Sequence, residues 1–364
     1  MNLRLAHLEL DRRALRANLA LARAAAPAAR VMACIKAQAY GHGLLFAAST
    51  LAEACDAFAV ACTGEGVELR RAGFEQQRLC VLNGPVDREE LEAAVTWELE
   101  PVIHQPWQLD ALARMGPPER LRAWLKIDSG MGRIGIRPEE AADWHDRLRQ
   151  CAVVREPVGV MTHMARADDR NDRFTAEQWQ VFSSAVDGLG APRSAANSAS
   201  VLGWPAAHGE WIRPGIMLYG CSPFIEGAQP ELGLQPVMTL KAPLIAINQV
   251  PAGSTLGYGS TWSAPEAMPV GVVGIGYGDG YPRAVPNGTP VLIAGQRAPL
   301  VGRVSMDKIA VDLRGIDVEV GAKATLWGRG LPVEEIAQRA GTIGYELLCS
   351  VYGRVPVMRS RSGA

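Results

Sequence analysis

The stretch VMACIKAQAYGHG, residues 31–43, carries the clearest indication of how this chain folds. Residues 31–35 form an apolar run that fits a buried β-strand, and the chain then becomes polar at Lys36 and rich in glycine at 41–43. Residues that follow a buried parallel strand lie at the edge of the sheet where active sites form. The stretch therefore predicts a strand that delivers Lys36 to a functional site.

Over the first 220 residues, short β-like runs of this kind alternate with helical stretches. This alternation indicates parallel strands joined by helical crossovers. Eight such runs favour an α/β fold with an N-terminal (β/α)8 TIM barrel, with a doubly wound open sheet as the alternative. The β-like runs are residues 31–35, 57–62, 79–83, 100–103, 123–127, 158–162, 193–196 and 211–218, and helical patterns cover 44–54, 66–72, 88–97, 106–115, 138–150 and 176–188.

The alternation of β-like and helical segments ends at residues 222–234, a stretch that contains several prolines and glycines. From residue 237 onward most segments are short and β-like, and one helical pattern at 332–340 interrupts them. We therefore predict a barrel domain over residues 1–233 and a mainly β C-terminal domain over residues 234–364. The β-like segments are 238–248, 270–276, 291–294, 300–304, 309–313 and 324–327.

Composition and charge argue against several classes of protein. The 364 residues are 48% hydrophobic and 21% charged, as in ordinary globular enzymes. A net charge of -1 without a basic block argues against nucleic acid and membrane surfaces as partners. We expect neither a secretory signal nor a membrane span, because no apolar run approaches the roughly 20 residues that a span requires. Seven scattered cysteines and six isolated histidines predict reduced thiols, no metal site and a cytoplasmic location.

Lys36 is the first candidate for chemistry. A lysine at the mouth of a barrel strand is partly desolvated, which makes its neutral amine available for a Schiff base, although a solvated strand-end lysine is the common alternative. The residues Tyr40-Gly41-His42-Gly43 favour the functional interpretation, because glycine lets backbone approach a ligand and tyrosine and histidine have polar tips. The stretch 35–43 resembles the signature of alanine racemases around the lysine that binds pyridoxal 5'-phosphate (PLP). This chain has Gln38 where the family usually has asparagine.

The segment LKIDSGMGRIG, residues 125–135, also resembles the family. Glycines around Arg133 suit a loop that brings a guanidinium to a small carboxylate in a bidentate pair, whereas a surface arginine in a turn is the alternative. The resemblance implies that Arg133 contacts the substrate carboxylate and the phenolic oxygen of the cofactor. It also implies that Lys126 can be carbamylated, which would turn a cation into an anion that positions Arg133.

Three more barrel segments, residues 159–165, 195–198 and 212–220, resemble the part of the family that binds PLP. The resemblance implies that His163 lies beside the PLP ring and that Arg213 faces the pyridine nitrogen, which a protonated arginine keeps unprotonated. Taken alone, these residues would be a strand-end histidine, a helix N-cap at Ser198 and an arginine that caps carbonyls. The cofactor-binding residues implied by the resemblance are Lys36, Tyr40, His163, Asn197, Ser198, Arg213, Gly215 and Ile216.

Segments of the β domain at 256–262, 274–281 and 302–307 resemble the family as well. The resemblance implies that Tyr258 is the second catalytic acid/base, that Tyr277 narrows the substrate entrance and that the Met306 amide binds the substrate carboxylate. Without the resemblance, Tyr258 would be a turn residue and Met306 a core residue. One departure concerns Gly353, which stands where many relatives have a phosphate-binding tyrosine, and we assign no phosphate role to its neighbour Tyr352.

Together these motifs imply an enzyme that interconverts L- and D-alanine through an external aldimine with PLP. Racemisation removes the α-proton from one face and returns a proton to the other, so we expect Lys36 to serve the D-isomer and Tyr258 the L-isomer. The resemblance also implies a homodimer in which the partner's β domain completes each site. A PLP-dependent decarboxylase, a PLP-binding barrel with a homeostatic role and a protein without PLP are the alternatives. Two questions stay open. One is whether the enzyme also acts on serine, and the other is whether it supplies D-alanine for peptidoglycan precursors or takes part in alanine catabolism.

Overall fold

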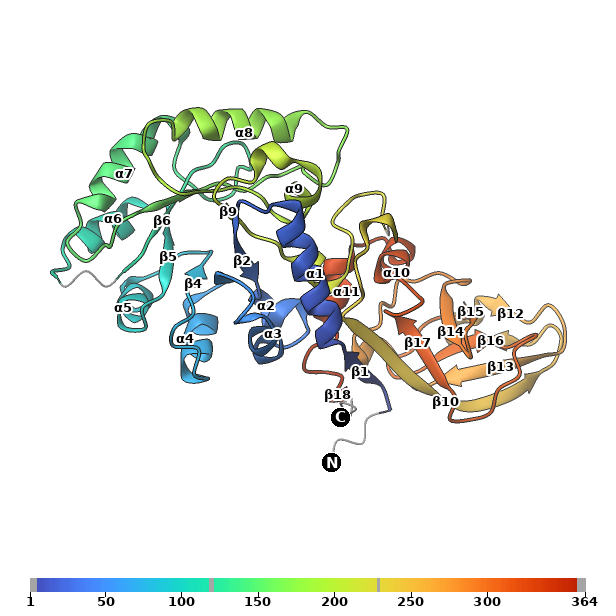
Figure 1. Ribbon diagram of the computed structural model, residues 1–364. Coiled ribbons are helices and arrows are strands. Elements are labelled where there is room, and N and C mark those ends of the chain that lie inside the picture. The colour runs from blue at the N-terminus through green and yellow to red at the C-terminus, as the bar shows by residue number, and fades with distance from the viewer. Residues whose placement is uncertain (1–4, 118–120, 228–229, 359–364) are drawn as a thin grey trace.

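The computed structural model describes residues 5–117, 121–227 and 230–358. The chain forms a barrel, at the left in Figure 1, and a separate body of β-strands at the right. None of the helices in the described ranges combines the length and the apolar character that a bilayer crossing requires.

Eight parallel strands close into a barrel, which confirms the predicted (β/α)8 architecture and excludes the open sheet. Neighbouring strands pair in chain order, and the last pairs with the first through Arg30 opposite Trp211 and Val31 opposite Ile212. The strands are β2 (Arg30–Cys34), β3 (Ala57–Val60), β4 (Leu79–Val81), β5 (Glu100–Ile103), β6 (Trp124–Lys126), β7 (Gly159–Met161), β8 (Arg193–Ser194) and β9 (Trp211–Ile212).

Helices cover the outside of the barrel, most of them where the helical patterns predict. The crossover elements are α3 (Leu44–Leu51), α4 (Thr63–Arg71), α5 (Arg88–Thr96), α6 (Pro106–Ala113), η1 (Pro138–Glu140), α7 (Ala141–Arg149), α8 (Phe174–Ala185), α9 (Ser198–Gly203), η2 (Pro205–Ala207) and η3 (Ile216–Tyr219). One further helix, α1 (Arg12–Ala25), precedes the barrel and was not predicted. Asp11 caps it by accepting hydrogen bonds from the backbone N–H groups of Arg13 and Ala14 at 2.8 and 3.1 Å.

Side chains fill the barrel interior, so the barrel is a packed core without a channel. Small and large residues alternate there, because a barrel of eight strands has little room at its axis. Trp124 and Trp211 pack edge to face at 6.0 Å, and a Cβ on Gly159 would overlap the Trp124 ring. The interior cluster consists of Met32, Cys34, Ala57, Ala59, Cys80, Val102, Trp124, Met161 and Trp211.

The second body is an eight-stranded sheet in the order β13-β16-β15-β14-β17-β10-β1-β18. Its longest strand, β10, pairs with β1 and β17 in its first half and with β13 in its second, so the sheet curls back on itself. The strands are β1 (His7–Leu10), β10 (Met238–Val250), β13 (Met268–Val273), β14 (Pro290–Ile293), β15 (Gln296–Val301), β16 (Ile309–Asp312), β17 (Lys323–Trp327) and β18 (Val357–Met358). The other elements are η4 (Pro230–Leu232), the hairpin β11 (Thr255–Leu256) and β12 (Trp262–Ser263) around η5 (Tyr258–Ser260), η6 (Tyr277–Asp279), α10 (Val333–Ala340) and α11 (Gly344–Ser350).

Strand β1 comes before the barrel in sequence but belongs to the second body, where it lies between β10 and β18. The sequence analysis identified neither β1 nor α11. The division at residues 233 and 234 stays a prediction, and the pairing of β1 ties the start of the chain to the later sheet.

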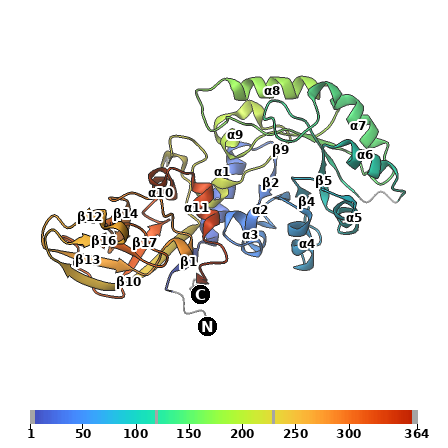
Figure 2. The ribbon, with the colours of Figure 1, turned by 180° about the vertical axis from the view of Figure 1, so that it is seen from behind.

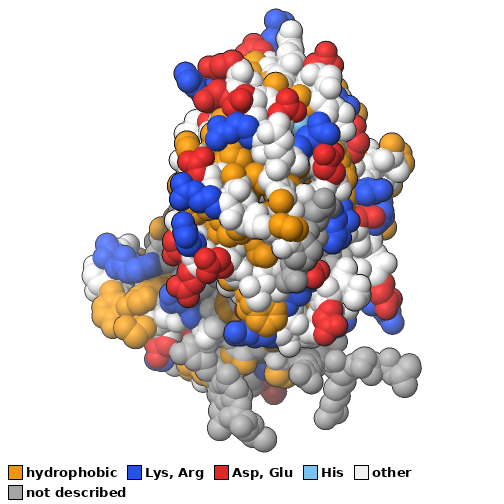
Figure 3. All heavy atoms as spheres, turned by 90° about the vertical axis from the view of Figure 1, so that its left-hand side faces the viewer, with side chains coloured by type: hydrophobic (Ala, Val, Ile, Leu, Met, Phe, Trp, Pro, Cys, Tyr) orange, Lys and Arg blue, Asp and Glu red, His pale blue; other side chains and the backbone are white. Residues whose placement is uncertain are grey.

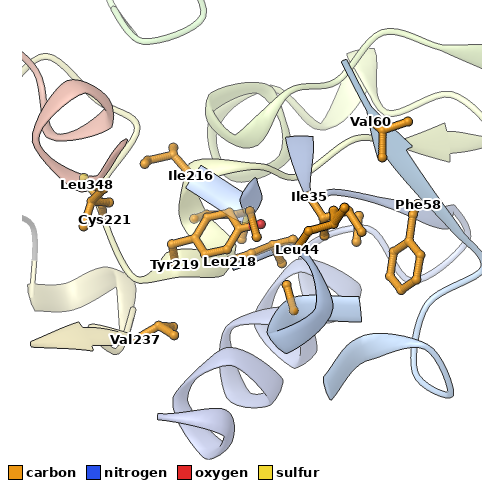
Figure 4. Close-up of a cluster of buried hydrophobic side chains, with 14 of the residues drawn as sticks. Ile35, Leu44, Phe58, Val60, Ile216, Leu218, Tyr219, Cys221, Val237 and Leu348 are labelled. Atoms are coloured by element: carbon orange, nitrogen blue, oxygen red, sulfur yellow. The ribbon is translucent and has the colours of Figure 1, made fainter. Parts of the chain in front are cut away.

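The two bodies share one hydrophobic core. Figure 4 shows part of it, where Ile35 and Leu44 from the barrel lie near Tyr219, and Leu348 of α11 and Val237 approach from the other side. This packing fixes α11 against the start of the barrel. On the surface, Lys, Arg, Asp and Glu side chains are interspersed over the face in Figure 3, in keeping with the small net charge.

Candidate active site

Most of the residues proposed from sequence meet at one mouth of the barrel. Lys36 follows β2, Lys126 ends β6, His163 follows β7 and Arg213 follows β9. All are therefore at the C-terminal ends of parallel strands, where barrel enzymes place their active sites. His163 lies within electrostatic reach of Lys36, Lys126, Arg133 and Arg213, each of which lowers its pKa.

The backbone after Lys36 forms a left-handed turn. Ala37, Gln38, Ala39 and Tyr40 all have φ between 52° and 54°, within the short element α2 (Lys36–Tyr40). Each such residue costs roughly 1–2 kcal/mol relative to the right-handed conformation, because its Cβ crowds the following carbonyl. A run of four therefore persists only where surrounding contacts hold it.

The contacts that hold the turn come from its own neighbours. His42 is 1% exposed, and its Nδ1 lies 3.0 Å from both the Ala39 and the Tyr40 carbonyl oxygens. Because carbonyls only accept, Nδ1 carries the proton and donates to both. The Gln38 side chain accepts from the Leu44 N–H at 3.1 Å, so the residue that departs from the usual asparagine caps α3.

Tyr40 forms one wall of the mouth. Its ring stacks on Tyr219 at 4.9 Å, and Tyr219 in turn donates to the Cys34 carbonyl at 2.9 Å. Burial raises the pKa of Tyr40 well above its usual value, so this phenol stays protonated as a hydrogen-bond donor. A Cβ on Gly215 would overlap the Tyr40 hydroxyl, so only glycine lets this phenol approach the backbone after β9.

A cluster of hydrogen-bonding groups lies beside Gly215. The Ser198 hydroxyl accepts from the backbone N–H groups of Gly215 and Met217 at 2.8 and 3.3 Å. Asn197, and not Ser198, is the N-cap of α9, since its side chain accepts from the Ser200 N–H at 3.0 Å. Backbone N–H groups and a hydroxyl gathered at a strand end are groups of the kind that bind a phosphate.

Arg213 is buried at the centre of the mouth. Its guanidinium donates to the Ser194 hydroxyl at 2.5 Å and to the Thr162 and Ala195 carbonyls at 2.6 and 3.3 Å. No carboxylate pairs with it among the residues that the structure describes, and burial lowers its pKa. A protonated guanidinium held only by neutral acceptors can face a neutral ring nitrogen without competition from a counter-ion.

The tautomer of His163 follows from its contact with Arg213. Arg213 Nη2 lies 3.4 Å from His163 Nδ1, and a guanidinium can only donate, so Nδ1 is the acceptor and Nε2 carries the proton. Burial, followed by the charges of Lys126 and Arg213, lowers the pKa of His163 well below its usual value. His163 is therefore a neutral donor through Nε2.

Lys126 and Arg133 lie on β6 and in the loop after it. Burial and then the cations Arg213 and Arg133 lower the pKa of Lys126 well below its ordinary value, which favours the neutral form of its amine. Arg133 is exposed on a loop that Asp128 organises by accepting from the backbone N–H groups of Gly130, Met131 and Gly132. A neutral buried amine beside two guanidinium groups is the form that reacts with carbon dioxide, and the resulting anion would be attracted to both.

The three residues of the second body are not brought to this mouth. Tyr258 is 70% exposed, Met306 61% and Tyr277 37%. Tyr258 lies in η5, between β11 and β12, and Figures 1 and 2 both show β12 at the end of the second body that points away from the barrel. Tyr277 and Met306 are neighbours, since the Gly278 N–H donates to the Met306 carbonyl at 2.7 Å. Within one chain, therefore, the predicted site is divided between two distant places.

Two residues that contact the site at the barrel mouth were not predicted from the sequence. Ser194 accepts from Arg213, and its position directly before the 195–198 segment was an available signal. Glu65 accepts from the Ala37 N–H directly after Lys36, but a lone glutamate in a helical pattern gave no indication of that contact.

This chain is similar to known proteins of one family over most of its length. The family models for the alanine racemase N-terminal domain and the alanine racemase C-terminal domain match residues 10–223 and 237–359. The alanine racemase of Halorhodospira halophila is 53% identical over 343 residues, which cover 94% of each chain. The crystal structure of biosynthetic alanine racemase from Pseudomonas aeruginosa superposes with a TM-score of 0.93 at 44% identity, covering 99% of this chain and 100% of that one. An alanine racemase from Bartonella henselae with covalently bound pyridoxal phosphate superposes with a TM-score of 0.89 at 26% identity, covering 98% and 99%.

Proposed function

Because this chain belongs to the alanine racemase family, we propose that it is a PLP-dependent isomerase that interconverts L- and D-alanine. The observation that carries the proposal is the position of His163, within electrostatic reach of Lys36, Lys126, Arg133 and Arg213 at one barrel mouth. Seven free cysteines, five of them buried, agree with a reducing cytoplasm as its location.

The residues at the mouth fit PLP. The Tyr40 hydroxyl, which only glycine at 215 lets approach the backbone, and the Ser198 hydroxyl beside Gly215 suit its phosphate, with Tyr40 as a protonated donor. Arg213 suits the pyridine nitrogen, because a guanidinium without a carboxylate partner stays a donor. Lys36 would hold the cofactor covalently, and Asn197, His163 and Ile216 complete the proposed set. When bound, PLP supplies the electron sink that makes the α-proton of the amino acid acidic.

The chain itself supplies the two proton-transfer groups. We assign the proton of the D-isomer to the Lys36 amine and the proton of the L-isomer to the Tyr258 phenol. A single group reaches one face of the α-carbon and mainly returns the proton to that face, so inversion needs a second group on the other face.

His163 orients the phenol of Tyr258. Since His163 Nδ1 accepts from Arg213, its Nε2–H is left to donate toward the phenol oxygen of Tyr258. This hydrogen bond would orient the phenol oxygen toward the α-carbon, so that Tyr258 exchanges the proton of the L-isomer.

The substrate carboxylate is assigned to Arg133 and to the Met306 amide, with Tyr277 beside the entrance. A carbamate on Lys126 would orient Arg133 by opposite charge. The neutral, buried amine of Lys126 favours this modification.

We propose a homodimer in which Tyr258, Tyr277 and Met306 of one copy close the barrel mouth of the other. The support is the exposure of all three and the position of Tyr258 beside β12, away from the mouth of its own chain, since a catalytic phenol must reach the α-carbon. Two-fold symmetry then makes two equivalent sites.

Complementation between two inactive variants tests mechanism and assembly together. Lys36→Ala should lose the visible absorbance of the lysine-bound cofactor, whereas Tyr258→Phe should keep it and racemise about 10²- to 10⁴-fold more slowly. Unfolding and refolding a mixture of both variants should restore activity, because each mixed dimer has one site with both groups. With random pairing, about a quarter of the wild-type activity is expected.

A control variant and two contrary results complete this test. Tyr352→Phe alters an exposed tyrosine to which no role is assigned and should racemise alanine at the wild-type rate. A Tyr258→Phe enzyme that matches the wild type would exclude the two-group assignment. A mixture that stays inactive although mixed dimers form would exclude the shared site.

A further inference from the structure

Glu65 lies on α4, outside every segment to which a function was assigned, and its carboxylate joins two strand ends of the barrel. Oε1 accepts from the Ala37 N–H, directly after β2 and Lys36, at 2.7 Å. Oε2 accepts from the Ala61 N–H, directly after β3, at 2.7 Å. Both oxygens are thus committed to backbone groups at the mouth.

We propose that Glu65 is a positioning residue that aims Lys36 by fixing the first peptide of the left-handed turn. The proposal rests on the role of Lys36 in the proposed function. Ala37 has φ 52° and ψ 51°, and its N–H is the first backbone donor after the lysine. A change in the backbone conformation of Ala37 would rotate the Lys36 side chain relative to the barrel.

The two ends of the turn are held by different residues. His42 binds the Ala39 and Tyr40 carbonyls at the far end, and Gln38 caps α3. Glu65 alone holds the near end through a side chain, among the contacts of the described residues. Its loss should therefore loosen the turn from the end next to Lys36.

Helix α4 keeps the carboxylate in place. Glu65 is the third residue of the helix, in the first turn, where free N–H groups favour a negative charge. Two charge-assisted hydrogen bonds of this length are strong and directional. A purely structural link between α4 and β3 would need only the Ala61 contact, so the Ala37 contact is the one that carries the proposal.

Glu65→Gln is the first test, because it keeps the size of the side chain while its amide can accept only one of the two N–H groups. Glu65→Asp keeps the charge but is one methylene too short to reach both, and it serves if the glutamine variant does not fold. Glu68→Gln is the matched control, since Glu68 is an exposed residue of the same helix.

Hydrogen exchange in the cofactor-free protein gives a readout that needs no activity. We expect amides of residues 36–40 to exchange about 10- to 100-fold faster in Glu65→Gln, as the loss of one charge-assisted hydrogen bond implies. PLP added to the same protein should attach to Lys36 more slowly, and kcat for alanine should fall about tenfold or more while KM changes little. Glu68→Gln should match the wild type in every measurement.

Two results would overturn the inference. One is wild-type exchange at residues 36–40 and wild-type attachment of PLP in Glu65→Gln. The other is a lower melting temperature with unchanged attachment and kcat, which would make Glu65 a structural link only. Failure of the proposed function is distinct, because then the wild type and Glu68→Gln would also neither bind PLP nor racemise alanine.

Discussion

The buried imidazole of His42 should make the stability of this protein depend on acid. Nδ1 already donates to two carbonyls, and Nε2 has no hydrogen-bond partner among the described residues. Protonation would add a second N–H without an acceptor in a buried position, where the imidazole packs on the Tyr219 ring with 4.6 Å between ring centroids. Burial accordingly lowers the pKa of His42 from 6.5 to about 4.

The size of the stability loss follows from the difference between the pKa values of His42 in the unfolded and folded chain. The unfolded chain takes up the proton near pH 6.5 and the folded chain only near pH 4, so the stability is fully present above pH 6.5 and is lost as the pH falls toward 4. At about 1.36 kcal/mol per unit of pKa, the loss is about 2 kcal/mol at pH 5 and about 3 kcal/mol at pH 4.

His42→Asn isolates this contribution. The asparagine NH2 group can donate to the same carbonyls but does not titrate, so urea unfolding of the cofactor-free variant should lose about 2 kcal/mol less than the wild type between pH 8 and pH 5. The difference between the two proteins at pH 8 measures the cost of repacking and is subtracted. Equal losses in both proteins would refute the assignment of the acid sensitivity to His42.

Two further predictions concern the proposed cofactor and substrate groups. Gly215→Ala should raise the Kd for PLP about 10- to 100-fold in a fluorescence titration, because its Cβ would displace the Tyr40 hydroxyl. Gly116→Ala, whose Cβ meets no atom within 4 Å, should leave the Kd unchanged, and equal affinities in both variants would count against the proposed phosphate site. Equilibration with ¹³C-bicarbonate should produce a carbamate resonance that is absent from Lys126→Met, since the Lys126 amine is neutral and buried; a resonance that survives the substitution would place the modification elsewhere.

Much of the fold could be predicted because each barrel strand is short and buried on both faces. Such strands read as apolar runs, and the polar residue that ends each run marks the rim, as for Lys36 and Arg213. Strand β1 escaped because its partner, β10, lies more than 220 residues away, and α11 escaped because its burial depends on packing against the barrel. Non-local pairing of this kind leaves no local pattern.

The sequence by itself determined which residues are candidates: the lysine after β2, the segment at 195–198 and the tyrosine between two glycines at 258 all stand in ordered motifs. Only the tertiary structure decided how they act. It shows that His163 donates through Nε2, that the turn after Lys36 is left-handed and tied to Glu65, and that Tyr258 lies far from the mouth of its own chain. The physical reason is that residue type is local, whereas the direction of a hydrogen bond, the burial of a charge and the distance between two groups depend on segments far apart in sequence.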